Sequence, residues 1–141
     1  MPETPNKVLA ICLPQRQYVP CNHMASMLAL GIRLGQNPCG FSNVALVAKG
    51  SSMLPHLRQQ IADEALDVHK ATHLLWVDDD HSLPENTVER LLAHDKPVVG
   101  INASTRSHPI KPTARLSIDE IAVQILKGNH HAKNHAGYVD A

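Results

Sequence analysis

Short apolar runs alternate with segments of helical periodicity, and this order constrains the fold of the chain more than any other feature. Apolar runs of this length, bounded by proline, glycine or polar residues, are typical of strands buried on both faces. The predicted strands are residues 7–13, 44–48, 73–77 and 97–101. Helical patterns separate them, so the predicted order is β-α-β-α-β-α-β. This alternation predicts an α/β fold, with a mostly parallel sheet and helices on its faces.

The connecting helices are predicted from apolar spacing and from residues that start or stop helices. The first covers residues 22–34, and its apolar face consists of Met24, Met27, Leu28 and Leu34. The second has the most regular spacing, at Leu54, Leu57, Ile61, Ala65 and Val68. The third is expected to begin at Ser82, which forms a capping box with Glu85, and Pro84 suits its first turn.

Length and composition limit the classes of protein to consider. The chain has 141 residues, which suits one domain, and 43% of them are hydrophobic, so disorder is not expected. Its 13 basic and 13 acidic residues give no net charge, which argues against nucleic acid or an anionic membrane as partner. Neither a basic, apolar leader nor an apolar run near the ~20 residues of a membrane span is present. The prediction is a cytoplasmic protein without a transmembrane segment, whose three cysteines are reduced.

Three consecutive aspartates, Asp78, Asp79 and Asp80, follow the third predicted strand. Ligands of parallel α/β sheets bind beyond the carboxyl ends of the strands, where these side chains would lie. On an extended backbone Asp78 and Asp80 point to one side, about 6.6 Å apart, and Asp79 points to the other. Two such carboxylates suit Mg²⁺ or Mn²⁺, completed by substrate phosphates and water. Two alternatives are considered. The first is a solvated acidic loop. The second is a cap for the next helix, but Ser82 already offers such a cap, so capping explains at most one of the three aspartates.

The stretch THLLWVDDDHSLPENTVERLLAHDKPVVGINASTRSHPIKPTA resembles the nucleotide-sugar half of GT-A glycosyltransferases. It is most similar to the family-2-like proteins common in bacteria and phages. An ordered set of motifs carries the resemblance: an apolar strand, D-x-D, a P-x-N-T-V-x-R-L-L helix, V-V-G-x-N and an R-x-x-P-x-x-P-T-A loop. The upstream LPHLRQQIADEAL also resembles the helix before the D-x-D strand of that family. The likeness covers about residues 7–115.

This resemblance implies a three-layer Rossmann-like fold, a nucleotide-sugar donor and Mn²⁺ or Mg²⁺ as cofactor. It implies that Asp78 faces the ribose or reaches the metal through water, and that Asp80 binds the cation, with Asp79 between them. It also implies that the loop beginning at Pro14 lies along the nucleobase. The predicted metal ligands are Asp78 and Asp80. The predicted donor-binding residues are Asp78, Asp79, Asp80, Arg58, Arg106 and Pro14.

Two of these residues have open roles. Arg58 lies on the apolar face of the second helix, and either meets a phosphate or carboxylate at the sheet end or is a surface arginine. Arg106 lies in the loop with the R-x-x-P-x-x-P-T-A motif, and is either a donor or acceptor contact or a solvated side chain.

The chain departs from the family pattern in its last part. Residues 1–115 are predicted to form the nucleotide-sugar-binding domain, and residues 116–141 a short helical and polar tail with a helix over 117–127. That tail does not resemble the segment that supplies the base and the acceptor site in the family, so the chain is similar to a truncated or minimal member. The acceptor is not predicted, and a homo-oligomer that completes the site is considered. Two alternatives are an inactive nucleotide-binding or assembly module, and a nucleotidyltransferase, against which the glycine-free loop 14–18 counts.

Overall fold

The computed structural model describes residues 6–16 and 18–101. The chain divides into two compact units, Met1–Asp95 and Lys96–Ala141, and every helix and strand of the described residues belongs to the first. The elements are β1 (Val8–Gln15), α1 (Cys21–Gln36), β2 (Asn43–Gly50), α2 (Leu54–Asp63), a π-helix (Glu64–Val68), β3 (His73–Trp76) and α3 (Thr87–Leu92). The predicted helix 117–127 and the predicted domain boundary after residue 115 lie outside the described residues.

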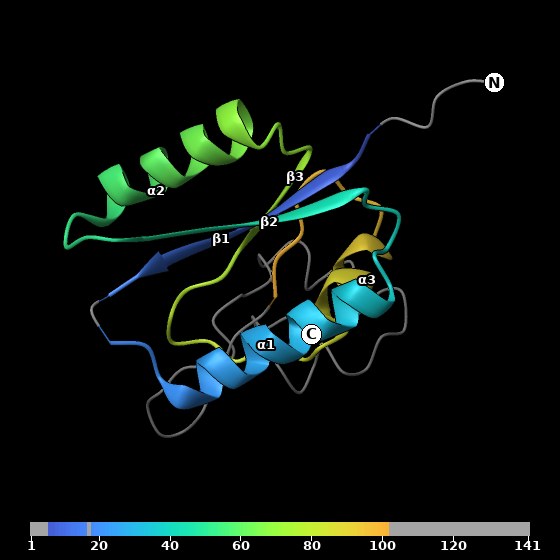
Figure 1. Ribbon diagram of the computed structural model, residues 1–141, viewed down its shortest axis with the longest axis horizontal. Coiled ribbons are helices and arrows are strands. Elements are labelled where there is room, and N and C mark those ends of the chain that lie inside the picture. Colours follow the sequence, from blue (N-terminus) through green and yellow to red (C-terminus); the bar gives the residue numbers. More distant parts are fainter. Residues whose placement is uncertain (1–5, 17, 102–141) are drawn as a thin grey trace, which may run out of the picture. The chain divides into compact units, whose positions relative to one another are not determined.

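The described strands form a parallel sheet in the order β2-β1-β3, with β1 in the centre (Figure 1). The pairing of β1 with β2 runs from Val8 opposite Asn43 to Gln15 opposite Gly50. The pairing with β3 is shorter and ends at Cys12 opposite Trp76. The predicted α/β class and the parallel arrangement of the first three strands are therefore confirmed.

Alternate residues of β1 contribute to two separate core clusters, because successive side chains of a strand point to opposite faces. Leu9, Ile11 and Leu13 pack with residues of α1 and α3. Ala10 and Cys12 pack on the other face, against α2 and the π-helix, together with Val47, Leu57, Ile61 and Ala65. Helices therefore cover both faces of the sheet (Figure 1).

The buried face of helix α1 agrees only in part with the predicted one. Its buried apolar residues are Leu30 and Leu34, with Met27 partly buried. Met24 and Leu28 are instead 63% and 67% exposed. Apolar residues occur on all sides of this helix, so their spacing did not identify the side that packs against β1.

The start of α3 also differs from the prediction. The helix begins at Thr87 after the N-cap Asn86, whose side chain forms no capping hydrogen bond with the described backbone. The predicted capping box at Ser82 is therefore wrong. Leu83 packs against the core beside Val88, and the Thr87 hydroxyl donates to the Pro84 carbonyl at 2.6 Å. A proline also disfavours helical backbone in the residue before it, so Leu83 cannot readily be part of a helix that continues through Pro84.

The fourth predicted strand is wrong for the described residues. Residues 97–101 belong to no strand, and the chain bends at Pro97 and Val98. Val98 is 88% exposed and Ile101 is 52% exposed. A run of apolar residues permits a strand but does not supply its partner, and an unpaired run has no ladder of hydrogen bonds.

The structure also bears on the predictions about a transmembrane segment and about the cysteines. Within residues 6–16 and 18–101, no helix is long and apolar enough to cross a membrane. All three cysteines are free; Cys12 is buried and Cys21 is exposed. Burial raises the pKa of the Cys12 thiol from 9.0 to about 11.

Candidate functional site

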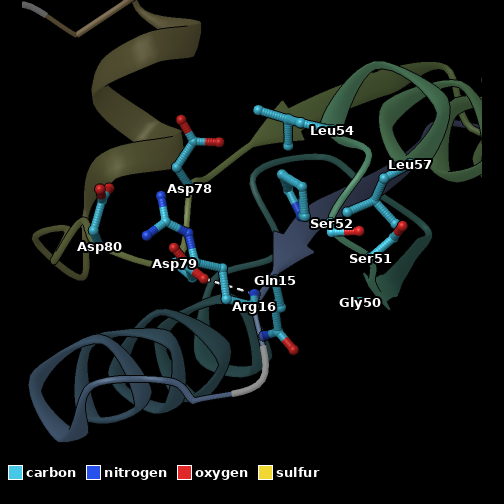
Figure 2. Close-up of a pocket in the computed structure, with 11 residues that line it drawn as sticks. Gln15, Arg16, Gly50, Ser51, Ser52, Leu54, Leu57, Asp78, Asp79 and Asp80 are labelled. Atoms are coloured by element: carbon cyan, nitrogen blue, oxygen red, sulfur yellow. Dashed lines mark hydrogen bonds between the residues drawn. The ribbon is translucent and has the colours of Figure 1, made fainter.

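A cavity of about 820 Å³ lies at the carboxyl edge of the sheet (Figure 2). Because the strands are parallel, their carboxyl ends meet at this one edge, where ligands of α/β sheets bind. The cavity is within the size range of small-molecule sites, about 300–1,000 Å³. Its lining comes from the ends of β1 and β2, from the segments that follow all three strands, and from α2. It consists of Pro14, Gln15, Arg16, Gly50, Ser51, Ser52, Leu54, Leu57, Asp78, Asp79 and Asp80.

The three aspartates lie in a tight turn, which we call the aspartate turn (residues 78–81). Strand β3 ends at Trp76, and the His81 amide donates to the Asp78 carbonyl at 3.1 Å. The backbone is therefore not extended from Asp78 to Asp80, so the extended geometry from which the separation of those two carboxylates was predicted does not hold. Each carboxylate instead contacts a different part of the chain.

Asp79 is the buried member of the three, with only 8% of its surface exposed. Its Oδ2 accepts a hydrogen bond of 2.7 Å from the backbone N–H of Arg16, directly after β1 (Figure 2). A hydrogen bond to a carboxylate is roughly twice as strong as one between neutral groups. Asp79 therefore fastens the aspartate turn to the end of the central strand, a role that sequence reasoning did not assign to it.

Asp78 forms an ion pair with Arg58 of α2. The Arg58 Nη2 donates to the Asp78 Oδ1 at 2.9 Å, and the two side chains are 47% and 46% exposed. Arg58 therefore contacts a carboxylate at the sheet end, which was one of its two predicted roles. An ion pair this exposed adds little to stability, so both groups can change partner at small cost.

Asp80 is adjacent to the imidazole of His81. The His81 Nδ1 lies 2.7 Å from the Asp80 Oδ1, and the Asp80 side chain is 34% exposed. None of the three aspartates caps α3, because its N-cap is Asn86. Helix capping therefore does not explain the aspartate cluster.

The donor set can be compared with what a divalent cation requires. Among the described residues, no group of three or more His, Cys, Asp or Glu side chains is arranged to hold a metal ion. Mg²⁺ sites, however, commonly use one or two carboxylates together with phosphate oxygens and water. The partly exposed carboxylates of Asp78 and Asp80 fit a site that the substrate completes, and do not fit a cage built by protein alone.

The cavity lining also includes residues outside the aspartate turn. Pro14 is buried and lines the cavity, as does Arg16 two residues later. Arg106 lies outside the described residues. Sequence reasoning missed the Gly50-Ser51-Ser52 segment, although its position directly after a predicted parallel strand is a signal for a ligand-binding loop.

Comparison of the chain with protein-family models, with curated proteins and with solved structures found no match. The geometry of the cavity and its residues is therefore the basis for assigning a function.

Proposed function

We propose that this chain binds a nucleoside diphosphate sugar, together with Mn²⁺ or Mg²⁺, in the cavity at the carboxyl edge of its sheet. The observation that carries the proposal is the convergence of all three strand ends on one cavity that contains the aspartate turn. The resemblance of the D-x-D segment and its flanking motifs to GT-A glycosyltransferases supports the same ligand.

The two sides of the cavity differ in chemistry. Figure 2 shows the aspartates on one side, and Ser51, Ser52 and Leu57 on the other. An apolar wall with a few hydroxyl groups suits a ribose and base. A diphosphate beside three carboxylates would be repelled, unless a cation lies between the two sets of oxygens. The acidic side of the cavity therefore favours a ligand that arrives with a divalent metal.

The residues available to that metal are Asp78 and Asp80, because the carboxylate of Asp79 is buried and bonded to the backbone. When bound, the cation would act as a Lewis acid that stabilises the departing nucleoside diphosphate. Arg58 is next to Asp78 and adds a positive charge at the same edge. This side chain offsets the charge of the Asp78 carboxylate until a cation takes its place.

The proposal includes the finer fold class, the three-layer Rossmann-like architecture of GT-A enzymes. Helices on both faces of a parallel sheet support it. It also includes glycosyl transfer to an acceptor. The alternative is an inactive module of the same fold, which would bind the donor in the same cavity. Release of the sugar from the donor, measured with metal binding intact, separates the two.

Calorimetry with a panel of nucleoside diphosphates tests the binding step. With Mn²⁺ present, at least one nucleoside diphosphate is expected to bind, and EDTA is expected to abolish that binding. Asp80→Ala and Asp78→Ala should each weaken it by at least about tenfold, since each removes one of the two available carboxylates. Asp67→Ala is the matched control, because Asp67 is exposed and does not line the cavity.

Two results would contradict the proposal. Equal affinity in Mn²⁺ and in EDTA would exclude a metal bridge between the carboxylates and the diphosphate. Unchanged affinity in Asp80→Ala and Asp78→Ala would show that the ligand binds away from the aspartate turn.

A further inference from the structure

A buried histidine on α1 contacts the aspartate turn. His23 lies in the first turn of the helix and is 1% exposed. Its Nδ1 is 2.6 Å from the carbonyl oxygen of His81, the last residue of the turn. A carbonyl oxygen only accepts hydrogen bonds, so Nδ1 carries a hydrogen and is the donor.

The other nitrogen of this ring, Nε2, contrasts with Nδ1. Nε2 of His23 is buried and has no hydrogen-bond partner among the residues that the structure describes. A buried polar atom without a partner destabilises a fold, and an aliphatic side chain at this position would avoid that penalty. Core packing alone therefore does not account for an imidazole here, whereas the bond to His81 does.

The aspartate turn is held from three sides. Asp79 is bonded to the end of β1, Asp78 is paired with α2, and His81 is bonded to α1. His81 is fixed through both of its backbone groups, because its N–H donates to Asp78 and its carbonyl accepts from His23. Its imidazole in turn contacts the Asp80 carboxylate at 2.7 Å. Movement of the His81 backbone would therefore move the side chain that contacts Asp80.

We propose that His23 is a positioning residue that holds the aspartate turn in its cation-binding geometry through the hydrogen bond to the His81 carbonyl. This inference rests on the proposed function of the turn. The imidazole of His23 does not touch the ligand. It restricts the turn, so that the Asp80 carboxylate is already in place when a cation arrives, and preorganisation of this kind raises affinity.

Two substitutions separate the hydrogen bond from the packing of the ring. His23→Leu fills the site with apolar atoms and removes the donor. His23→Asn leaves more empty space, but its side-chain amide can still donate to the His81 carbonyl. The control is Leu34→Ala, which removes a buried side chain at the opposite end of the same helix.

Two measurements are made on each variant: hydrogen exchange of the His81 amide, and calorimetric titration with Mn²⁺ alone. In His23→Leu, the amide should exchange about tenfold faster and the Kd for Mn²⁺ should rise about tenfold, the effect expected for one lost hydrogen bond. His23→Asn should stay close to the wild type in both, although its larger cavity lowers its unfolding temperature. Leu34→Ala should lower the unfolding temperature and change neither.

Other outcomes overturn the inference. Unchanged exchange of the His81 amide in His23→Leu means that His23 does not hold the turn. If the amide exchanges faster in His23→Leu but the Mn²⁺ affinity is unchanged, cation binding does not depend on His23. If Leu34→Ala loses as much Mn²⁺ affinity as His23→Leu, the affinity follows the overall stability of the fold. If the wild type binds Mn²⁺ only together with a nucleoside diphosphate, the same comparison is made with that pair. If it binds neither, the proposed function fails, while the exchange of the His81 amide still decides whether His23 holds the turn.

Discussion

The three aspartates are adjacent in sequence, yet the structure predicts different consequences for their removal. Asp79→Ala deletes a buried carboxylate and its 2.7 Å hydrogen bond from the Arg16 amide. Hydrogen bonds to charged groups contribute about 1.5–3 kcal/mol, so the free energy of unfolding should fall by about that amount. Asp78→Ala deletes only one half of an exposed ion pair, for which the expected change is about 0–1 kcal/mol.

An intermediate variant refines the prediction for Asp79. In Asp79→Asn the amide oxygen can still accept from the Arg16 N–H, but the bond loses its charge. Because neutral hydrogen bonds are roughly half as strong as charged ones, the loss should be about half that of Asp79→Ala. From the most to the least stable, the expected order is therefore wild type, Asp79→Asn and Asp79→Ala, with Asp78→Ala close to the wild type.

Urea unfolding followed by tryptophan fluorescence measures these differences. The chain has a single tryptophan, Trp76, which ends β3 two residues before the aspartate turn and is 40% exposed. The slope of the free energy against urea should stay constant, because the surface exposed on unfolding does not change. Equal urea midpoints for Asp79→Ala and Asp78→Ala would refute the assignment of Asp79 as the structural member of the cluster.

Three further predictions follow from single contacts. Arg58→Gln should change the free energy of unfolding by less than about 1 kcal/mol, because the ion pair is exposed. It should tighten binding of Mn²⁺ alone, because it releases the Asp78 carboxylate, and calorimetry measures the sign and size of this change in affinity. The Cys12 thiol keeps its proton longer in the folded than in the unfolded chain, so stability should fall between pH 9 and about pH 11. That fall should be larger by about 1–3 kcal/mol in the wild type than in Cys12→Ala, as measured by urea unfolding across this pH range. Leu57→Ala should cost about 2–5 kcal/mol, since Leu57 is 1% exposed, and an equal urea midpoint would contradict the packing of α2 on the sheet.

The class of fold could be predicted from the sequence, because the signals that define it are local. The short apolar runs at 7–13, 44–48 and 73–77 correspond to β1, β2 and β3, and helical spacing identified α2. Chain order alone also placed the aspartates at the carboxyl edge, since residues that follow parallel strands must lie there. The apolar run 97–101 shows the limit of such signals, because a strand also needs a partner.

The arrangement of the candidate site depended on contacts between residues distant in sequence. Arg16 and Asp79 are 63 residues apart, and His23 and His81 are 58 apart. These contacts decide that Asp79 is buried, that the backbone turns between Asp78 and His81, and that Asp78 and Asp80 remain accessible. Local periodicity contains no information about them, because they form only when β1, α1 and the end of β3 pack around one core. The sequence by itself therefore determined where three carboxylates gather, and the tertiary structure decided which of them supports the fold and which two remain partly exposed.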